Sequence, residues 1–225
     1  MPSNLVSVIG KIKPSIGLVF AIDPTNKIYG KGSGFVIEPG ILVTCNHVVA
    51  VQSANILLQF PDSDEKIAAK VAIRDEEHDL ALLKFDKKEI KPLKICKQEE
   101  IKEGMAVIFA GYPLDLLSLT THQGILSTIT TDDTGNTVYL IDGTVNSGNS
   151  GCPLMNDQGE VIGIVNAKRR EQSDLLSEVE KLKSGAISIH GIDMINIYKA
   201  LIENLQLGIG YAVPSVYIPK RQEVK

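Results

Sequence analysis

Short apolar segments separated by turn-forming residues recur along most of the chain, and this rhythm constrains the fold more than any other feature. In the first part of the sequence we expect strands over residues 16–22, 34–37, 41–44, 56–60, 67–73 and 79–85. Proline and glycine stand between these segments, for example at Pro39 and Gly40, where hairpin turns would fall. Evenly spaced strands of this length are typical of all-β sandwiches and barrels.

The strand pattern resumes after a polar connection. Residues 86–103 are rich in lysine and glutamate, and we place a boundary between two lobes near residue 100. In the second lobe we expect strands over residues 106–110, 124–129, 138–141, 160–165 and 210–214. The sequence therefore predicts one lobe over residues 1–100 and another over residues 101–225.

Two stretches of helical periodicity interrupt the second lobe within residues 173–206. The apolar positions of the first stretch are Leu175, Leu176, Val179 and Leu182. Asp193 is placed to cap the second stretch, and Gly208 follows its end. We expect a helical insertion near the C-terminus that either packs on the outer wall of the lobe or covers a cleft.

Length and charge narrow the classes of function. A chain of 225 residues with 44% hydrophobic content can bury a substantial core. The formal net charge of -4 argues against a nucleic-acid-binding surface. The first residues lack the basic start and long apolar run of a signal peptide, and no segment approaches the ~20 apolar residues of a membrane helix. These features favour a cytoplasmic protein without membrane contact.

One glycine-rich stretch, residues 142–154, has too little apolar content to serve the core, and it presents Ser150. Gly148 and Gly151 allow backbone conformations that bring successive N–H groups to one point. Such a donor pair would stabilise the negative charge that develops on a carbonyl oxygen during acyl transfer. The alternative interpretation is a hairpin turn whose serine is only solvated.

A serine hydroxyl needs a base that accepts its proton, and histidine has a suitable pKa. His47 follows two apolar strands and so lies at a strand end. By contrast, His78 neighbours a charged run, His122 is expected in a loop, and His190 lies inside the insertion. The alternative for His47 is a satisfied core histidine. Asp79 opens an apolar strand of the same lobe and is the natural carboxylate to orient the imidazole.

With these residues in the order His47, Asp79, Ser150, the chain resembles a trypsin-like serine protease of the HtrA (DegP-like) type over nearly its whole length. The matching motifs are Gly32-Ser-Gly-Phe35, Thr44-Cys-Asn-His-Val-Val49, His78-Asp-Leu-Ala-Leu-Leu-Lys84, Gly111-Tyr-Pro113 with Gly124-Ile-Leu-Ser127, Gly148-Asn-Ser-Gly-Cys-Pro-Leu154 with Gly159-Glu-Val-Ile-Gly-Ile164, and Gly208-Ile-Gly-Tyr-Ala-Val-Pro-Ser215.

The resemblance implies an all-β fold of two six-stranded antiparallel β-barrels with the active site in the cleft between them. It implies a His47, Asp79 and Ser150 triad and an oxyanion hole made by the backbone N–H groups of Gly148 and Ser150. It also implies four substrate-binding positions, namely Thr144, Val165, Asn166 and Ala167. Because no acid stands at position 144, we expect an aliphatic substrate side chain rather than lysine or arginine beside the scissile bond.

The function that follows is a serine endopeptidase that cleaves polypeptide substrates through an acyl-enzyme, with no cofactor or metal. One alternative is a catalytically silent or partner-activated peptide-binding protein on the same fold, in which the Ser150 turn is collapsed. Another is an esterase that uses the same triad. The family often carries a PDZ domain, and we see none after Ser215. The oligomeric state is left open.

Three cysteines, Cys45, Cys96 and Cys152, match neither a disulfide scaffold nor a zinc-binding spacing, so we expect free thiols. Cys45 lies two residues before His47, and Cys152 lies two residues after Ser150. One hypothesis is a Cys45–Cys152 disulfide that forms under oxidation and distorts the oxyanion turn. The alternative is a pair of small buried hydrophobic residues.

Overall fold

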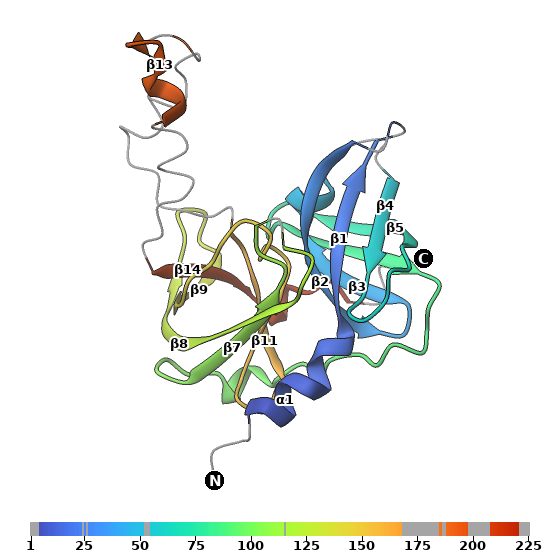
Figure 1. Ribbon diagram of the computed structural model, residues 1–225. Helices are drawn as coiled ribbons and strands as arrows, with labels where there is room; N and C mark the ends of the chain where they lie inside the picture. Colours follow the sequence, from blue (N-terminus) through green and yellow to red (C-terminus); the bar gives the residue numbers. More distant parts are fainter. Residues whose placement is uncertain are drawn as a thin grey trace. The chain divides into compact units, whose positions relative to one another are not determined.

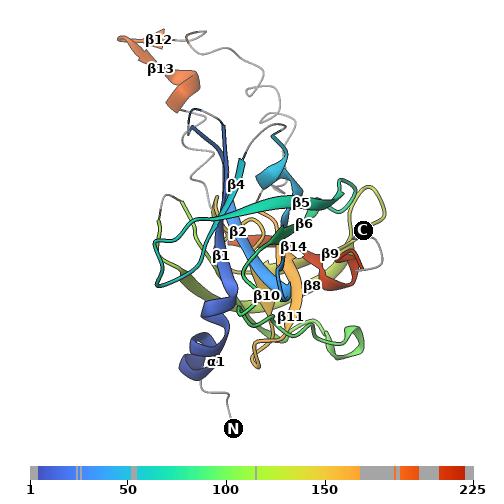
Figure 2. The ribbon, with the colours of Figure 1, turned by 90° about the vertical axis from the view of Figure 1, so that its right-hand side faces the viewer.

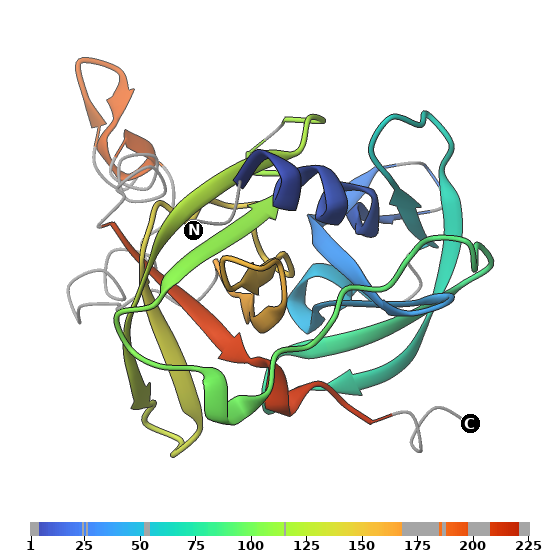
Figure 3. The ribbon, with the colours of Figure 1, turned by 90° about the horizontal axis from the view of Figure 1, so that it is seen from below.

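Two closed six-stranded antiparallel barrels lie side by side and make up most of the computed structural model (Figures 1 and 3). The structure describes residues 5–23, 25, 27–51, 55–114, 116–167, 185, 188–197 and 208–220. The chain divides into two compact units, Met1–Lys168 with Gly208–Lys225 and Arg169–Leu207, and the first unit holds both barrels. The predicted all-β class with two six-stranded barrels is confirmed.

The first barrel consists of six strands whose order around the barrel is β1-β2-β3-β6-β5-β4. Figure 2 labels β1, β2, β4, β5 and β6 of this barrel. The strands are β1 (Ile16–Ile22), β2 (Ile28–Glu38), β3 (Ile41–Cys45), β4 (Asn55–Gln59), β5 (Ile67–Asp75) and β6 (Leu80–Phe85). Gly40 has a φ of 79°, a left-handed conformation that glycine adopts readily, and it turns β2 into β3. Phe35, Leu42 and Leu83 are fully buried between the strands.

The second barrel has the strand order β10-β11-β14-β9-β8-β7. The strands are β7 (Ala106–Gly111), β8 (Thr120–Thr131), β9 (Thr137–Asp142), β10 (Pro153–Met155), β11 (Val161–Val165) and β14 (Ile209–Pro214). Strand β10 was not expected, because three residues are too few to show an alternating pattern. Tyr139, Phe109 and Leu126 are fully buried in this barrel.

The polar connection passes from the first barrel to the second over a few residues. Leu93 donates its backbone N–H to the Val36 carbonyl in β2 at 2.8 Å. The next contacts are with β11, where Cys96 donates to the Val161 carbonyl at 2.8 Å and Val161 donates to the Lys94 carbonyl at 2.7 Å. A 3-10 helix, η3 (Gln98–Glu100), then leads toward β7.

An N-terminal helix, α1 (Leu5–Ile12), continues through η1 (Lys13–Ser15) into β1 and was not expected from the sequence. Val8 and Ile12 are its buried residues. A Cβ added to Gly159, just before β11, would lie 3.0 Å from a methyl group of each, so the helix packs on the second barrel while it leads into the first (Figure 3). Among the described residues, no helix is long and apolar enough to cross a membrane.

The second unit contains a short hairpin of β12 (Ser188–Ile189) and β13 (Ile192–Asp193). His190 forms part of its turn with a φ of 52°, and it lies between the two predicted helical stretches. Asp193 Oδ1 accepts the N–H groups of Ile195 and Asn196, which makes it the predicted cap of a helix that begins at residue 194. The first predicted helical stretch lies outside the described residues.

Candidate active site

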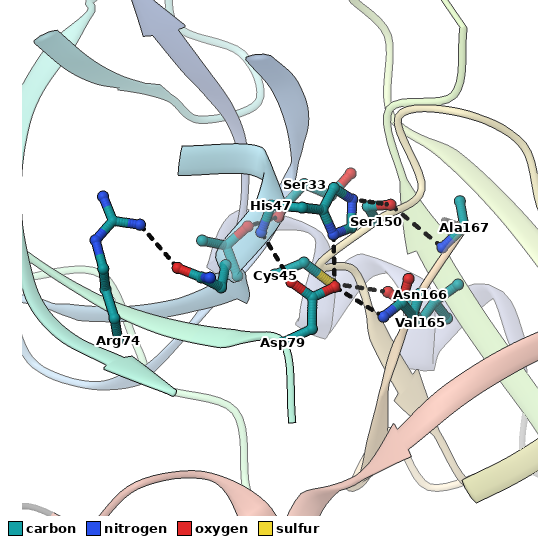
Figure 4. Close-up of polar contacts among 11 residues, drawn as sticks. Ser33, Cys45, His47, Arg74, Asp79, Ser150, Val165, Asn166 and Ala167 are labelled. Carbon is teal, nitrogen blue, oxygen red and sulfur yellow. Dashed lines mark hydrogen bonds and ion pairs between the residues drawn. The ribbon is translucent and has the colours of Figure 1, made fainter. Parts of the chain in front are cut away.

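The three residues of the expected triad come from separate segments of the two barrels and meet in one place (Figure 4). His47 lies in the 3-10 helix η2 (Asn46–Val49), directly after β3, and Asp79 directly precedes β6. Because Cys45 at the end of β3 pairs with Leu80 at the start of β6, the barrel itself brings His47 and Asp79 together. Ser150 is supplied by the second barrel, from the turn between β9 and β10.

The His47 imidazole joins the other two side chains. Its Nδ1 lies 2.6 Å from Asp79 Oδ2, and its Nε2 lies 2.9 Å from Ser150 Oγ. A carboxylate can only accept, so a neutral imidazole carries its proton on Nδ1 and accepts the Ser150 hydroxyl at Nε2. Asp79 and His47 side chains are 22% and 21% exposed, and Ser150 is 4% exposed.

Several hydrogen bonds hold the Asp79 carboxylate. Oδ1 accepts the backbone N–H of His47 at 2.9 Å, and Oδ2 also accepts the Asn166 side-chain amide at 2.9 Å. Burial alone would raise the pKa of Asp79. The hydrogen bonds from His47, the charge of His47 and the hydrogen bond from Asn166 outweigh burial and lower this pKa below its usual value. Asp79 is therefore an ionised partner for the imidazole. Its backbone has a φ of 56°, which aspartate tolerates better than most residues.

The segment that carries His47 is held from the neighbouring strand β5. Arg74, labelled in Figure 4, donates from Nη1 to the Asn46 side-chain oxygen at 2.7 Å. It also donates from Nη2 to the Val49 carbonyl at 2.6 Å. The guanidinium thus spans η2 from its first residue to its last. Two bonds from one rigid fork restrict the orientation of the helix that presents His47.

The turn before Ser150 adopts a conformation that requires glycine. Gly148 has a φ of 91°, and a Cβ there would overlap the Tyr112 carbonyl oxygen. The Ser147 carbonyl accepts the N–H of Leu114 at 2.6 Å. Since C=O and N–H of a trans peptide point in opposite directions, the Gly148 N–H faces away from Leu114. Within the described part of the chain, neither the Gly148 nor the Ser150 N–H has an acceptor.

Ser33 was missed as a functional position by sequence reasoning, although it lies in one of the motifs. Its hydroxyl is fully buried, donates to the Gly148 carbonyl at 2.7 Å and accepts the Tyr112 N–H at 2.9 Å. Its backbone N–H donates to the Ser150 carbonyl at 2.8 Å. Ser33 therefore joins β2 of the first barrel to both sides of the Ser150 turn. A lone serine in a strand gives no sequence signal for such long-range bonds.

The four predicted substrate-binding residues have different surroundings. Ala167 donates its N–H to Ser150 Oγ at 3.2 Å, and Thr144 is exposed. Asn166 is 1% exposed and its side chain is bonded to Asp79. Val165 is fully buried in the core of the second barrel, where every residue of β11 is enclosed by protein. Contact of these four residues with substrate stays a prediction.

The remaining described histidines near the barrels pack against aromatic rings, as expected of ordinary packing residues. His78 stacks on Tyr217 with ring centroids 4.0 Å apart, and His122 stacks on Phe109 at 4.8 Å. Burial lowers the pKa of His122. The three cysteines are free and buried.

The chain matches the family model of the trypsin-like peptidase domain over residues 32–164, which is more than half of its length. It belongs to the trypsin-like peptidase family. A probable periplasmic serine endoprotease, DegP-like, of Pseudomonas fluorescens is 41% identical over 137 residues, covering 59% of this chain and 28% of that protein. A serine protease Do-like HtrA of Lactobacillus helveticus is 35% identical over 196 residues, covering 80% of this chain and 46% of that protein.

The chain thus spans less than half the length of these curated relatives. Two solved structures share its fold. A serine endoprotease from Yersinia pestis has a TM-score of 0.68 at 23% identity, and the match covers 96% of this chain and 64% of the Yersinia chain. A protease from M. tuberculosis in its active form has a TM-score of 0.68 at 22% identity, and the match covers 94% of this chain and 80% of the M. tuberculosis chain.

The expectation of a cytoplasmic protein is contradicted. Relatives from Pseudomonas fluorescens and Rickettsia conorii are both named periplasmic serine endoproteases. The expectation depended on the lack of a recognisable leader in the first residues, and that feature does not determine the compartment in which a folded domain works.

Proposed function

We propose that this chain is a serine endopeptidase in which Ser150 is the nucleophile, His47 the general base and Asp79 the carboxylate that orients it. The observation that carries the proposal is the pair of contacts made by one imidazole, 2.6 Å to Asp79 and 2.9 Å to Ser150. These distances lie within hydrogen-bond reach, which proton transfer from the hydroxyl requires. The names of the relatives, a serine endoprotease and a serine protease, support the same conclusion.

In the proposed reaction, Ser150 Oγ attacks the scissile carbonyl while His47 Nε2 takes the hydroxyl proton. The carbonyl oxygen gains negative charge and accepts hydrogen bonds from the N–H groups of Gly148 and Ser150. The Asp79 carboxylate stabilises the imidazolium that forms, and His47 then donates the proton to the leaving amine. Water attacks the resulting acyl-enzyme by the same route and regenerates Ser150.

The orientation of the Gly148 peptide supports an active oxyanion turn rather than a collapsed one. The Ser147 carbonyl is bonded to Leu114, so it does not occupy the position of the substrate oxygen. The exposed Thr144 offers no charge to a lysine or arginine side chain. We therefore propose polypeptide substrates with an aliphatic side chain at the residue before the cleaved bond.

The experiment that tests the proposal is labelling by a fluorophosphonate, which reacts with activated serine hydroxyls. We expect rapid labelling of the wild-type protein and none of Ser150→Ala or His47→Ala. Ser127→Ala, an exposed serine in β8, is the matched control and should label as wild type. Casein cleavage compared with hydrolysis of a simple ester then separates an endopeptidase from an esterase. A folded wild-type protein that does not label would contradict the proposal and favour a partner-activated or silent protein.

A further inference from the structure

The sulfur atom of Cys45 lies beside the His47–Asp79 pair. Cys45 is fully buried, and its Sγ lies 3.4 Å from the Val165 carbonyl. Figure 4 shows this sulfur beside the Asp79 carboxylate. Ligand atoms of Cys45, His47 and Asp79 all lie within 4.8 Å of one another. The three side chains come together because Cys45, at the end of β3, pairs with Leu80 and so lies beside Asp79. His47 follows Cys45 by two residues.

We propose that Cys45 Sγ, His47 Nδ1 and an Asp79 carboxylate oxygen form an inhibitory zinc site. A thiolate, an imidazole nitrogen and a carboxylate are the donor types that Zn²⁺ accepts, and three protein ligands leave a fourth position for water. Binding at this site is independent of Ser150. The inhibitory consequence rests on the function proposed above, because it acts through the base of that reaction.

Only small movements are needed to bring the three atoms onto one ion. Zinc bonds of 2.0–2.3 Å at tetrahedral angles set the ligand atoms about 3.3 to 3.8 Å apart. The Nδ1 to Oδ2 distance of 2.6 Å therefore has to open, and the sulfur has to approach from at most 4.8 Å. Asp79 keeps its bond from the His47 backbone through Oδ1 while Oδ2 turns toward the ion.

Zinc binding changes the protonation of both Cys45 and His47. The fully buried Cys45 thiol carries its proton before metal arrives. Zinc displaces that proton, which passes to the solvent, and the Nδ1 proton of the neutral imidazole moves to Nε2. One proton is released in total. Nε2 then carries hydrogen toward Ser150 Oγ and has no lone pair for the hydroxyl proton.

The chain contains matched cysteines for a test. Cys152 is also fully buried and close to Ser150 in sequence, but it is not one of the three ligands. Cys96, with Glu100 and Glu160, forms a separate group of possible ligands outside the site, although Glu160 already pairs with Lys94. Substitution of Cys96 therefore removes a second place where zinc could bind.

The inhibition test measures fluorophosphonate labelling with and without Zn²⁺, and compares each protein with itself. We expect Zn²⁺ to slow labelling of wild type, Cys152→Ala and Cys96→Ala over the same concentration range, with recovery on addition of EDTA. Cys45→Ala should require at least about tenfold more Zn²⁺ for the same slowing, because one ligand is lost. Equal sensitivity of Cys45→Ala and wild type, or no slowing of wild type, would overturn the proposal.

A binding test that does not need catalysis uses Co²⁺ with the Ser150→Ala, Cys96→Ala double variant. A thiolate-to-cobalt charge-transfer absorption is expected, and it should vanish when Cys45→Ala is added. If this band forms but wild type does not label at all, the proposed protease function fails while the metal site stands. If the band is absent, or persists without Cys45, the metal site is wrong whatever the labelling result.

Discussion

The carbonyl oxygen of Ser147 accepts the backbone N–H of Leu114 at 2.6 Å, and this bond orients the peptide that precedes Gly148. Leu114 has a φ of 54°, a left-handed conformation that costs a leucine about 1 to 2 kcal/mol. The Leu114 carbonyl in turn accepts Lys31 Nζ from β2 at 2.8 Å. The conformation of the turn before Ser150 therefore depends on a loop from the second barrel and a strand from the first.

Gly148→Ala is expected to abolish the oxyanion turn. The new Cβ would overlap the Tyr112 carbonyl, and alanine disfavours a φ of 91°. We expect labelling to slow by roughly 10²- to 10³-fold, the effect of losing one oxyanion donor. Gly104→Ala is the control, because Gly104 also has a positive φ but open space around it. Equal labelling rates for the two variants would show that the Gly148 peptide is not needed.

Ser33→Ala should weaken both the fold and the site. It leaves the buried Gly148 carbonyl and Tyr112 N–H without their hydrogen-bond partner, which costs about 1 to 3 kcal/mol of unfolding free energy. Urea unfolding and labelling rate would measure the two effects, with Ser127→Ala as the exposed control. A stability change as small as that of the control would contradict the role assigned to this hydroxyl.

Asp79→Asn should preserve the shape of the site but slow catalysis. An amide at this position can donate to His47 Nδ1, which favours the imidazole tautomer with its proton on Nε2, and the base is then blocked. We expect peptide cleavage to fall by about 10⁴-fold with little change in substrate binding. Separate measurement of kcat and KM checks this. A large rise in KM with an unchanged kcat would mean that Asp79 acts mainly in binding.

The lowered pKa of Asp79 also predicts acid sensitivity of the fold. As pH falls, the unfolded chain takes up this proton before the folded chain does, so the stabilisation is complete above the ordinary aspartate pKa and is lost as pH falls through the lower, folded value. The stability difference between wild type and Asp79→Asn should therefore shrink as pH is lowered from about 7 to about 3. Urea unfolding across this range measures the difference, and a constant gap would contradict the prediction.

Local sequence pattern predicted most strands well. The segment 16–22 coincides with β1, and the others fall within or close to observed strands because their apolar residues face a barrel core. Strand β10 and helix α1 were missed. The three residues of β10 are too few to show a periodic pattern of apolar residues. Helix α1 is stabilised by packing of Val8 and Ile12 beside Gly159, a contact between distant parts of the chain.

The sequence by itself determined the all-β class, the His47, Asp79 and Ser150 candidates and the need for glycine before the serine. These follow from side-chain chemistry, strand periodicity and motif order. Only the tertiary structure decided that Ser33 and Leu114 hold the turn, that Asn166 bonds Asp79 and that Cys45 lies against the His47–Asp79 pair. Those relationships depend on barrel closure and on backbone groups that every residue carries, so no local pattern encodes them.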